Sequence, residues 1–450
     1  CAEGTNVSSV PVCSDLNRDC RLEFPRLSYQ TKRFLNDSVM DAGLIYAKIG
    51  DARLQRSLVR MLAGQRIKVQ IWGGSMTAGI SAHGPPWWRV FINRLREAFP
   101  RASVVVDTWG RPGCGVDCYL SLASLAAQGN DTDIIILDYG QNDAGFSADL
   151  YEIAIRMIHA LLPSALPVII YTAYRKGPKE YLGSWGDLEN VARYYKIPLI
   201  NFFHVELMYG KMGGDQRDIW RPAGDGWRHP SWVAHACLAD VLARWLNVEL
   251  CMLEARVLGD LADALVVERI KQTRVQRPDS LSHVDRSWIR PRKTNTFIPG
   301  WACLQPASSY NSFRPASADP RVSPNKSWSL YEDRPGKPGW IARPPSDWMT
   351  FPVTFGTKPS LLVMHLKSYE KLGNAQVKIM GDNADAKMCF VNINGLWESQ
   401  NHEKVSLTQI WILEERHLKI VCGIRPHVTG KVSFRVQTGE KFKITALATC

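Results

Sequence analysis

The sequence predicts an α/β domain followed by a domain built only of β-strands. Between Ile67 and Leu253, short runs rich in Val and Ile alternate with stretches whose apolar residues recur at helical spacing. From about residue 344, short runs of alternating apolar and polar residues follow one another with no helical stretch among them. Strands that are continuous in Val and Ile, each followed by a helix, are typical of a parallel sheet covered on both faces. Short strands alone are typical of a β-sandwich.

Five strands and five helices account for the α/β pattern. The first strand, Ile67–Ile71, follows an amphipathic helix, and the last helix closes the domain. The predicted strands are Ile67–Ile71, Ala102–Asp107, Asp133–Tyr139, Pro167–Thr172 and Pro198–Phe202. The predicted helices are Asp51–Ala63, Pro86–Phe99, Leu150–Leu161, Leu188–Tyr195 and His235–Leu253.

The remaining chain divides into three parts. Residues 1–50 are predicted to be an irregular segment pinned by disulfides, and residues 51–260 form the α/β domain. Residues 261–343 are rich in proline and predict a connector, which we expect to pack on a domain through Trp288, Trp301 and Trp328. Residues 344–450 form the predicted sandwich. Its strands are Thr350–Phe355, Leu361–Leu366, Gln376–Met380, Cys389–Ile393, Val405–Ile412, Leu418–Cys422, Lys431–Val436 and Phe442–Leu447.

The cysteines and the glycosylation triplets favour a secreted or lumenal protein. Eleven cysteines without a repeated C-x-x-C pair indicate a disulfide framework with one thiol left over. Asn-x-Ser/Thr triplets occur at Asn6, Asn36, Asn130 and Asn325. No run is apolar enough to predict a membrane span. The chain begins at Cys1 and not at Met, as it would after removal of a signal peptide or an amino-terminal anchor.

The net charge of +12 does not predict nucleic-acid binding. The basic residues are scattered, and their densest cluster, Arg286–Lys293, lies in the proline-rich stretch. None of the usual nucleic-acid-binding modules is visible. An acidic glycan partner, or solubility alone, explains the charge equally well.

Four loops with the residues of acyl-transfer chemistry follow predicted strands or precede the closing helix. Gly73-Gly74-Ser75 follows the first strand, and R-P-G-C-G, which includes Gly113, follows the second. G-Q-N-D, which includes Asn142, follows the third, and D-G-W-R-H-P, from Asp225 to Pro230, precedes the last helix. Loops after neighbouring parallel strands converge at one edge of the sheet. They would supply a serine nucleophile, an imidazole base, a carboxylate and N–H donors for an oxyanion.

The four loops resemble the sequence blocks of the SGNH (GDSL-like) hydrolase superfamily. G-G-S-M-T-A-G resembles the first block, R-P-G-C-G the second, G-Q-N-D the third, and H-P before a helix the fifth, over about residues 65–250. The resemblance implies a flavodoxin-like three-layer fold with a five-stranded parallel sheet. It also implies Ser75 as nucleophile and His229 as base, with an oxyanion hole formed by Ser75, Gly113 and Asn142. No metal or organic cofactor is implied.

The chain departs from this family pattern at two places. Gly74 stands where the family usually has an aspartate before the serine. The triad aspartate is normally three residues before the histidine, but Asp225 is four residues before His229, so Asp218 is an alternative acid. An α/β-hydrolase elbow is excluded because G-x-S-x-G would need a glycine where Thr77 stands.

Several of these residues also have an ordinary structural explanation. Asn142 with Asp143 would cap a helix, and His229 would start one. Cys114 and Cys118 would form a disulfide that stiffens the loop of Gly113. His235 is expected to be structural. Three tryptophans, Trp72, Trp87 and Trp88, are expected to be packed in the core and not stacked on sugar rings.

Taken together, the sequence predicts a serine esterase that removes O-acetyl or other short acyl groups from a glycan. The expected partner is an acylated carbohydrate or another ester. A glycan O-acetyltransferase that uses the same triad is one alternative, and a catalytically silent glycan-binding protein is another. The acyl group, the glycan, the disulfide pairing and the oligomeric state are not predicted.

Overall fold

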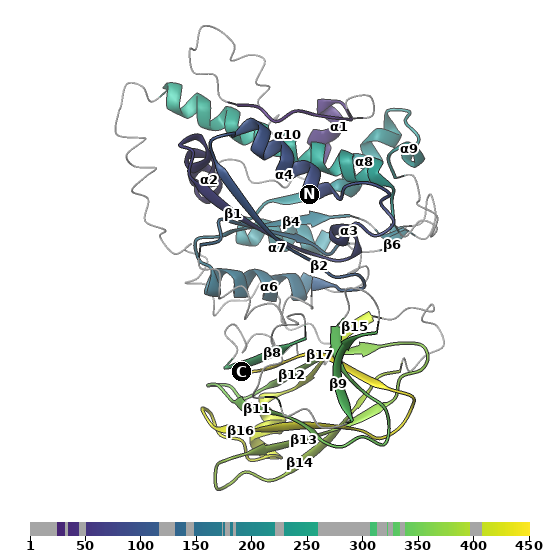
Figure 1. Cartoon of the computed structure of the whole chain (residues 1–450). Coiled ribbons are helices and arrows are strands. Elements are labelled where there is room, and N and C mark those ends of the chain that lie inside the picture. The colour runs from purple at the N-terminus through teal and green to yellow at the C-terminus, as the bar shows by residue number, and fades with distance from the viewer. Residues whose placement is uncertain are drawn as a thin grey trace, which may run out of the picture.

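The structure, a computed structural model, describes residues 25–31, 35–44, 51–116, 131–140, 148–172, 174–175, 181–182, 186–220, 229–259, 307–312, 322, 327–333, 338–396 and 407–450. Two domains lie one above the other, with helices and a parallel sheet above and antiparallel sheets below (Figure 1). Both predicted fold classes are therefore confirmed.

The upper domain is built on a parallel sheet of five strands in the order β2-β1-β3-β4-β7. The strands are β1 (Arg66–Gly73), β2 (Ser103–Gly110), β3 (Ile134–Asp138), β4 (Leu166–Tyr171) and β7 (Leu199–Asn201). This is the flavodoxin-like order, in which the chain turns back at β1 and places a crevice at the carboxyl ends of β1 and β3. A separate two-stranded sheet pairs β5 (Tyr174–Arg175) with β6 (Tyr181–Leu182).

Helices cover both faces of this sheet. The helices of the domain are α1 (Asp37–Ala42), α2 (Ala52–Leu62), α3 (Ser75–Ala78), α4 (Trp87–Ala98), α6 (Ala148–Leu161), α7 (Gly186–Tyr195), α8 (Phe202–Lys211), α9 (Gln216–Trp220) and α10 (Trp232–Gly259). Alternate residues of each strand face opposite ways. In β3, Ile136 packs with α2, α4 and α10, whereas Leu137 packs with α6 and α7. Burial on both sides explains why these strands are continuous in Val and Ile.

The lower domain is a sandwich of two antiparallel sheets. One sheet has the order β15-β12-β17-β10-β9, with β8 also paired to β17, and the other has the order β11-β16-β13-β14. The strands are β8 (Ser308–Asn311), β9 (Trp328–Glu332), β10 (Pro338–Ala342), β11 (Met349–Thr354), β12 (Leu361–Lys367), β13 (Asn374–Gly381), β14 (Cys389–Asn394), β15 (Leu407–Leu413), β16 (Thr429–Val436) and β17 (Phe442–Thr449).

The structure differs from the sequence prediction at two places in this domain. Strands β8, β9 and β10 belong to the sandwich, although they lie within residues 261–343, the predicted connector. They are short and separated by Pro-rich stretches, so they show no sustained alternation. The predicted strand Leu418–Cys422 overlaps the helix α12 (Glu415–Ile420), in which Lys419 and Glu415 form an ion pair one turn apart. Trp328 is buried in the sandwich core as expected, whereas Trp288 and Trp301 lie outside the described residues.

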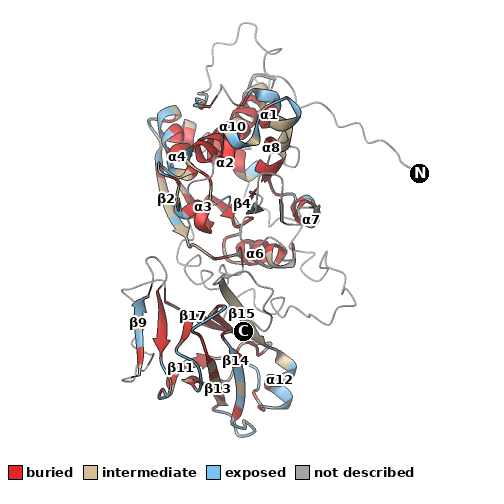
Figure 2. Ribbon diagram, turned by 90° about the vertical axis from the view of Figure 1, so that its right-hand side faces the viewer, coloured by how far each residue is buried: buried red, intermediate tan, exposed pale blue. Residues whose placement is uncertain are grey.

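The two domains share one apolar core. Leu362 and Met364 of β12 and Ala446 of β17 are buried in the same cluster as Ile155 and Ile158 of α6. Helix α6 lies between the parallel sheet and the sandwich in both views (Figure 2). The first sandwich sheet is thus covered on both faces, which explains why every residue of β17 is buried.

Asp240 and Asn247 of α10 hold residues 25–31 against the upper domain. Oxygens of Asp240 accept from the backbone N–H groups of Thr31 (2.6 Å) and Gln30 (3.1 Å), and Asn247 bonds the backbone of Leu27 in both directions (2.8 and 3.0 Å). Asp240 also forms a buried ion pair with Arg94 of α4 at 2.5 Å. This end of the predicted irregular segment is therefore fastened to α10.

The bonding state of six described cysteines is known. Cys389 is bonded to Cys422, and Cys114, Cys251 and Cys450 are also disulfide-bonded. Cys237 is free and buried in α10, where burial raises the pKa of its thiol to about 12. In the described part of the chain, no helix is both long enough and apolar enough to cross a membrane.

Candidate active site

Ser75 lies at the switch point of the parallel sheet. It is the first residue of the short helix α3 and directly follows β1 and Gly74. The Gly74 N–H donates to the carbonyl of Asp138 at the end of β3, at 3.1 Å. The turn that carries the serine is therefore anchored to the neighbouring strand, at the carboxyl edge where ligands bind in open α/β sheets.

The end of β2 approaches this turn closely because its last residue, Gly110, has no side chain. A Cβ atom on Gly110 would lie 2.6 Å from the backbone nitrogen of Ala78 and 2.8 Å from its Cα. These distances are shorter than any relaxed contact, so a side chain at this position would push β2 and α3 apart. The glycine in T-W-G-R-P-G-C-G thus allows the strand end to pack against the serine turn.

The loop with Gly113 lies beside the serine turn as predicted. The Arg111 N–H donates to the carbonyl of Gly73 at 2.8 Å, so the loop after β2 joins the end of β1. Gly113 has φ +74°, a left-handed conformation that favours glycine. Cys114 is buried in the core that is shared with the sandwich. Burial lowers the pKa of Arg111, and the carboxylate of Glu332 in β9 opposes this shift. The sandwich therefore supports this loop.

Asp138 is a buried carboxylate directly beneath the serine turn. Its Oδ2 accepts from the hydroxyl of Thr77 at 2.7 Å and from the indole N–H of Trp87 at 2.8 Å. Burial raises the pKa of Asp138 to about 6, and these two hydrogen bonds oppose the shift. The carboxylate joins α3 to the start of α4. Asp138 is also bonded through its backbone carbonyl to Gly74, the residue that replaces the usual aspartate of the family.

His229 is brought toward the same edge by the start of α10. The backbone N–H of Trp87 donates to Nδ1 of His235 at 3.3 Å. Burial, with a smaller contribution from the charge of His229, lowers the pKa of His235 to about 4. Trp232 of α10 packs against Gly84 in the segment that follows the serine turn. Hydrogen bonds thus connect Asp138 through Trp87 to His235, which lies six residues after His229.

The Ser75 side chain makes no hydrogen bond within the described residues. Its pairing with His229 therefore stays a prediction. Hydrogen bonds between catalytic groups are often long without substrate and shorten when the reaction complex forms.

Two predicted site residues, Asn142 and Asp225, lie outside the described residues, and so do Asp143 and Cys118. Their roles stay predictions. The alternative acid, Asp218, lies in α9. It is close to Tyr209, because its charge adds to the effect of burial in raising the pKa of that tyrosine. The end of α9 lies close to the segment of His229, since the Ser231 N–H donates to the Trp220 carbonyl at 3.3 Å.

The sequence prediction did not include Asp138, Thr77 or Trp87 as part of the site. An aspartate at the end of the all-aliphatic run I-I-I-L-D was the available signal, because a carboxylate there must be buried beside a partner. Trp72 and Trp87 are buried, with 1% and 0% of their surface exposed, so the expectation of core packing is confirmed for both. Trp87 in addition holds the carboxylate.

Metal ligands gather elsewhere. Within the described residues, the group that could hold a metal ion consists of Cys389, His417 and Cys422 in the sandwich. The two sulfurs of this group are already bonded to each other.

Solved structures with the same two-domain architecture exist. A two-domain esterase (CEX) active on acetylated mannans aligns over 91% of this chain and 98% of its own, with 15% sequence identity and a TM-score of 0.58. A structure of the esterase co-crystallised with mannopentaose aligns over 91% and 97%, also with 15% identity, at a TM-score of 0.57. No protein-family model and no curated protein matches the chain. The likeness shows a common fold in both domains, and the SGNH resemblance implied the fold of the first of them.

Proposed function

We propose that this protein is a serine ester hydrolase that removes acetyl or other short acyl groups from a glycan. The observation that carries the proposal is the packing of the Ser75 turn against the loop of Gly113 at the carboxyl edge of the parallel sheet. Backbone hydrogen bonds join the turn to β3 and to the loop after β2, and Trp87 bonds both Asp138 and His235 of α10. We infer that the start of α10 brings His229 to the same edge.

The mechanism follows from the chemistry of these groups. Ser75 Oγ attacks the ester carbonyl while His229 takes its proton, and the oxyanion is stabilised by the backbone N–H groups of Ser75 and Gly113 and the side chain of Asn142. The protonated imidazole then gives its proton to the sugar oxygen as its bond to the acyl carbon breaks, so the sugar leaves as a hydroxyl and an acyl-enzyme remains. Water, deprotonated by His229, releases the acid and restores the serine. Asp225 orients the imidazole in this scheme.

Two observations support a glycan substrate and a secretory address. The esterase that shares the fold of both domains acts on acetylated mannans, and its common architecture includes the sandwich. Disulfide bonding of Cys114, Cys251, Cys389, Cys422 and Cys450 is typical of an oxidising compartment.

Fluorophosphonate labelling tests the nucleophile directly. The probe should label the native protein, and Ser75→Ala should abolish the labelling. Ser103→Ala, at the exposed start of β2, serves as the matched control and should label like the native protein. His229→Ala should slow labelling by about 100-fold, because the hydroxyl loses its base. Equal labelling of the native protein and Ser75→Ala would overturn the assignment.

Incubation with an acetylated manno-oligosaccharide separates hydrolysis from transfer. Release of free acetate by the native protein, and not by Ser75→Ala, is the expected result. Acetate that appears only on an added acceptor glycan would instead identify the transferase alternative. Retention of the glycan without acetate release and without labelling would identify a silent binding protein.

A further inference from the structure

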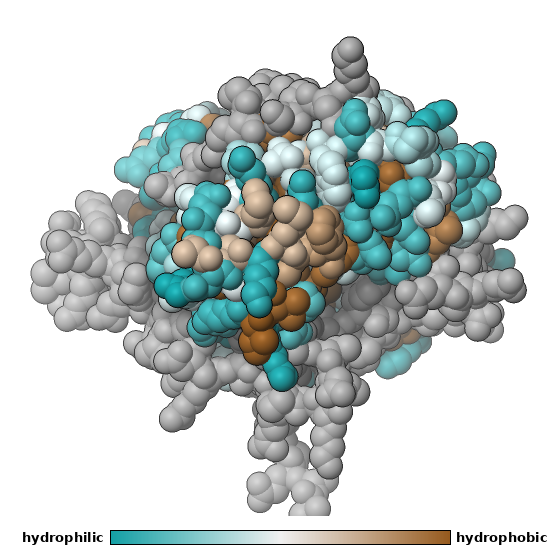
Figure 3. All heavy atoms as spheres, turned by 90° about the horizontal axis from the view of Figure 1, so that it is seen from below, coloured by the Kyte–Doolittle hydropathy of each residue, from teal (hydrophilic) through white to brown (hydrophobic). Residues whose placement is uncertain are grey.

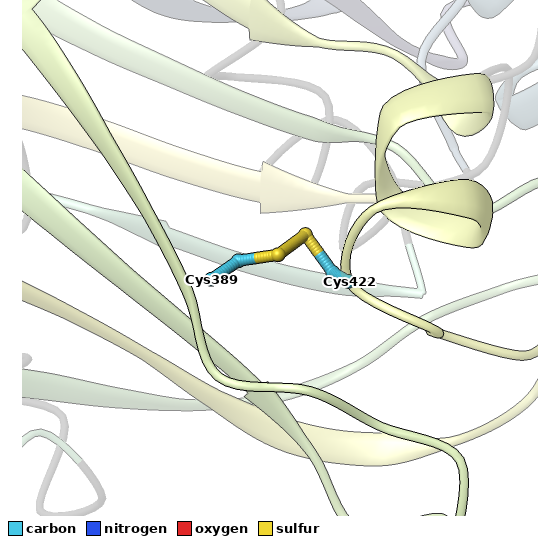
Figure 4. The surroundings of a disulfide bond; sticks show 2 residues. All are labelled: Cys389 and Cys422. Carbon is cyan, nitrogen blue, oxygen red and sulfur yellow. A yellow bond between two sulfur atoms is a disulfide. The ribbon is translucent and has the colours of Figure 1, made fainter.

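Four exposed apolar side chains surround one disulfide of the sandwich. Met388 and Phe390 flank Cys389 at β14, and they expose 56% and 51% of their surface. Ile420 and Val421 precede Cys422 at the end of α12, and they expose 71% and 50%. The disulfide joins the two segments (Figure 4). We call these four residues the disulfide patch.

The disulfide patch is a local concentration and not general surface composition. Figure 3 shows apolar side chains gathered among hydrophilic ones on the face seen from below the sandwich. Exposed apolar residues of the described upper domain, such as Ile80 and Met212, lie in separate segments after α3 and after α8. Single exposed apolar residues need no explanation, whereas apolar side chains grouped on one surface favour a binding site.

Three cations border the patch. Lys387 precedes Met388, and its backbone N–H donates to the carbonyl of Cys422 at 2.8 Å. Lys378 is opposite Phe390 in the β13–β14 pair, and Arg416 is one helical turn before Ile420. Within the described residues, none of these three cations forms an ion pair.

Two acids near the patch are neutralised by other cations. Asp385 is paired with Arg425, and Glu415 is paired with Lys419. These two acids therefore do not balance the charges of Lys387, Lys378 and Arg416. A partner that fits this surface must offer both an apolar phase and negative charge.

Trp348 adds an amphipathic ring beside the patch. The centroid of the Trp348 ring lies 6.3 Å from the centroid of the Phe390 ring. Lys378 Nζ and Arg435 Cζ each lie 4.7 Å from the Trp348 centroid. A partly exposed indole that is held by cations has an apolar body and polar surroundings. Tryptophan with lysine or arginine is the combination found at the boundary between lipid chains and headgroups.

We propose that the disulfide patch docks on the surface of an anionic lipid bilayer. Ile420, Val421 and Met388 present aliphatic and thioether groups that would bury well among acyl chains, whereas a sugar would leave its hydroxyls unpaired against them. Unpaired lysines are depleted in protein interfaces, but they gain energy at an anionic bilayer. The proposal does not depend on the esterase assignment.

The position of the patch is compatible with a free candidate active site. Sheet β11-β16-β13-β14 has one face in the sandwich core, and the other sandwich sheet packs against the upper domain. The patch is therefore at the far end of the molecule from the parallel sheet (Figure 1). Docking would hold the protein at a membrane surface and leave Ser75 accessible.

Vesicle sedimentation tests the docking. The native protein should pellet with vesicles of phosphatidylcholine and phosphatidylserine, and less with phosphatidylcholine alone. The double variant Phe390→Ser and Ile420→Asp should bind at least about tenfold more weakly, because two apolar anchors are lost. Met212→Asp, which changes an equally exposed methionine of the upper domain, is the matched control and should bind like the native protein.

The second variant, Lys387→Glu with Arg416→Glu, should lose the preference for the anionic vesicles, and added salt should weaken native binding. Two results would overturn the proposal. One is equal vesicle binding by the patch variant and Met212→Asp. The other is a native protein that binds no vesicles but forms a dimer which the patch variant disperses, because the patch would then be an interface between two copies.

Discussion

The hydroxyl of Thr77 donates a hydrogen bond of 2.7 Å to the carboxylate of Asp138, and this bond ties the serine turn to the neighbouring strand. Oδ1 of the same carboxylate has no donor among the described residues, so the charged form is incompletely compensated. This explains why burial dominates and raises the pKa of Asp138 to about 6.

The raised pKa predicts how Asp138→Asn changes stability with pH. The folded pKa of about 6 exceeds the unfolded value of 3.8, so the native state favours the protonated acid. The stabilising contribution of that preference is present below pH 3.8 and is lost as pH rises through 6. Asparagine can accept both hydrogen bonds without a charge. Relative to the native protein, Asp138→Asn should therefore gain roughly 3 kcal/mol between pH 4 and pH 7.

Urea unfolding at several pH values measures this difference. Thr77→Val is a useful second variant, because loss of one donor should raise the pKa of Asp138 further. A difference between Asp138→Asn and the native protein that is the same at every pH would contradict the assignment.

Gly110→Ala should destabilise the fold by about 2–3 kcal/mol. The added methyl group would lie 2.6 Å from the backbone nitrogen of Ala78, so β2 or α3 must move. Gly210→Ala in α8 is the control, since its nearest neighbour is the flexible end of Gln216 at 3.3 Å. That variant should gain about 0.5–1 kcal/mol from helix propensity. Equal unfolding midpoints for both variants would show that β2 does not press on the serine turn.

Asp240→Asn should cost about 3–5 kcal/mol, because Arg94 would keep its charge in the core without a carboxylate. The same change also weakens the attachment of residues 25–31, so early proteolysis in that segment should accompany it. Asp215→Asn breaks an exposed pair with Arg217 and should leave thermal unfolding unchanged. Similar melting temperatures for the two variants would exclude a structural role for the buried pair.

Met364→Asp tests the core shared by the two domains. Met364 of β12 is 2% exposed and belongs to the apolar cluster that includes α6. A carboxylate at this position should therefore cost at least about 3 kcal/mol of folding stability and loosen both domains together. Met388→Asp, on the exposed disulfide patch, is the control and should not change stability. If only the sandwich became sensitive to protease in Met364→Asp, the two domains would be independent.

Asn36 should carry an N-linked glycan if the proposed secretory address is correct. It is exposed, and its side-chain Oδ1 accepts from the Val39 N–H at 3.0 Å as the N-cap of α1. Protein secreted by a eukaryotic host should lose mass at this site on treatment with a glycosidase specific for N-linked glycans. Asn36→Gln should remove that change. Full occupancy of the other triplets with an unmodified Asn36 would argue against use of this one.

Sequence alone determined the architecture of the α/β domain and which loops follow its strands. The Val and Ile runs from Ile67 to Phe202 are buried on both faces, so their apolar residues are nearly continuous and easily recognised. G-G-S and R-P-G-C-G could be placed because glycine is required where backbones approach or φ is positive.

Tertiary structure alone decided the contacts between distant segments. Asp138, Thr77 and Trp87 meet because β3, α3 and α4 converge, a relation that sequence spacing does not contain. The same holds for the sandwich strands β8 to β10, which are too short to show a period until a sheet pairs them. Local patterns report which face of one element is buried, whereas the partner on that face depends on how the whole chain packs.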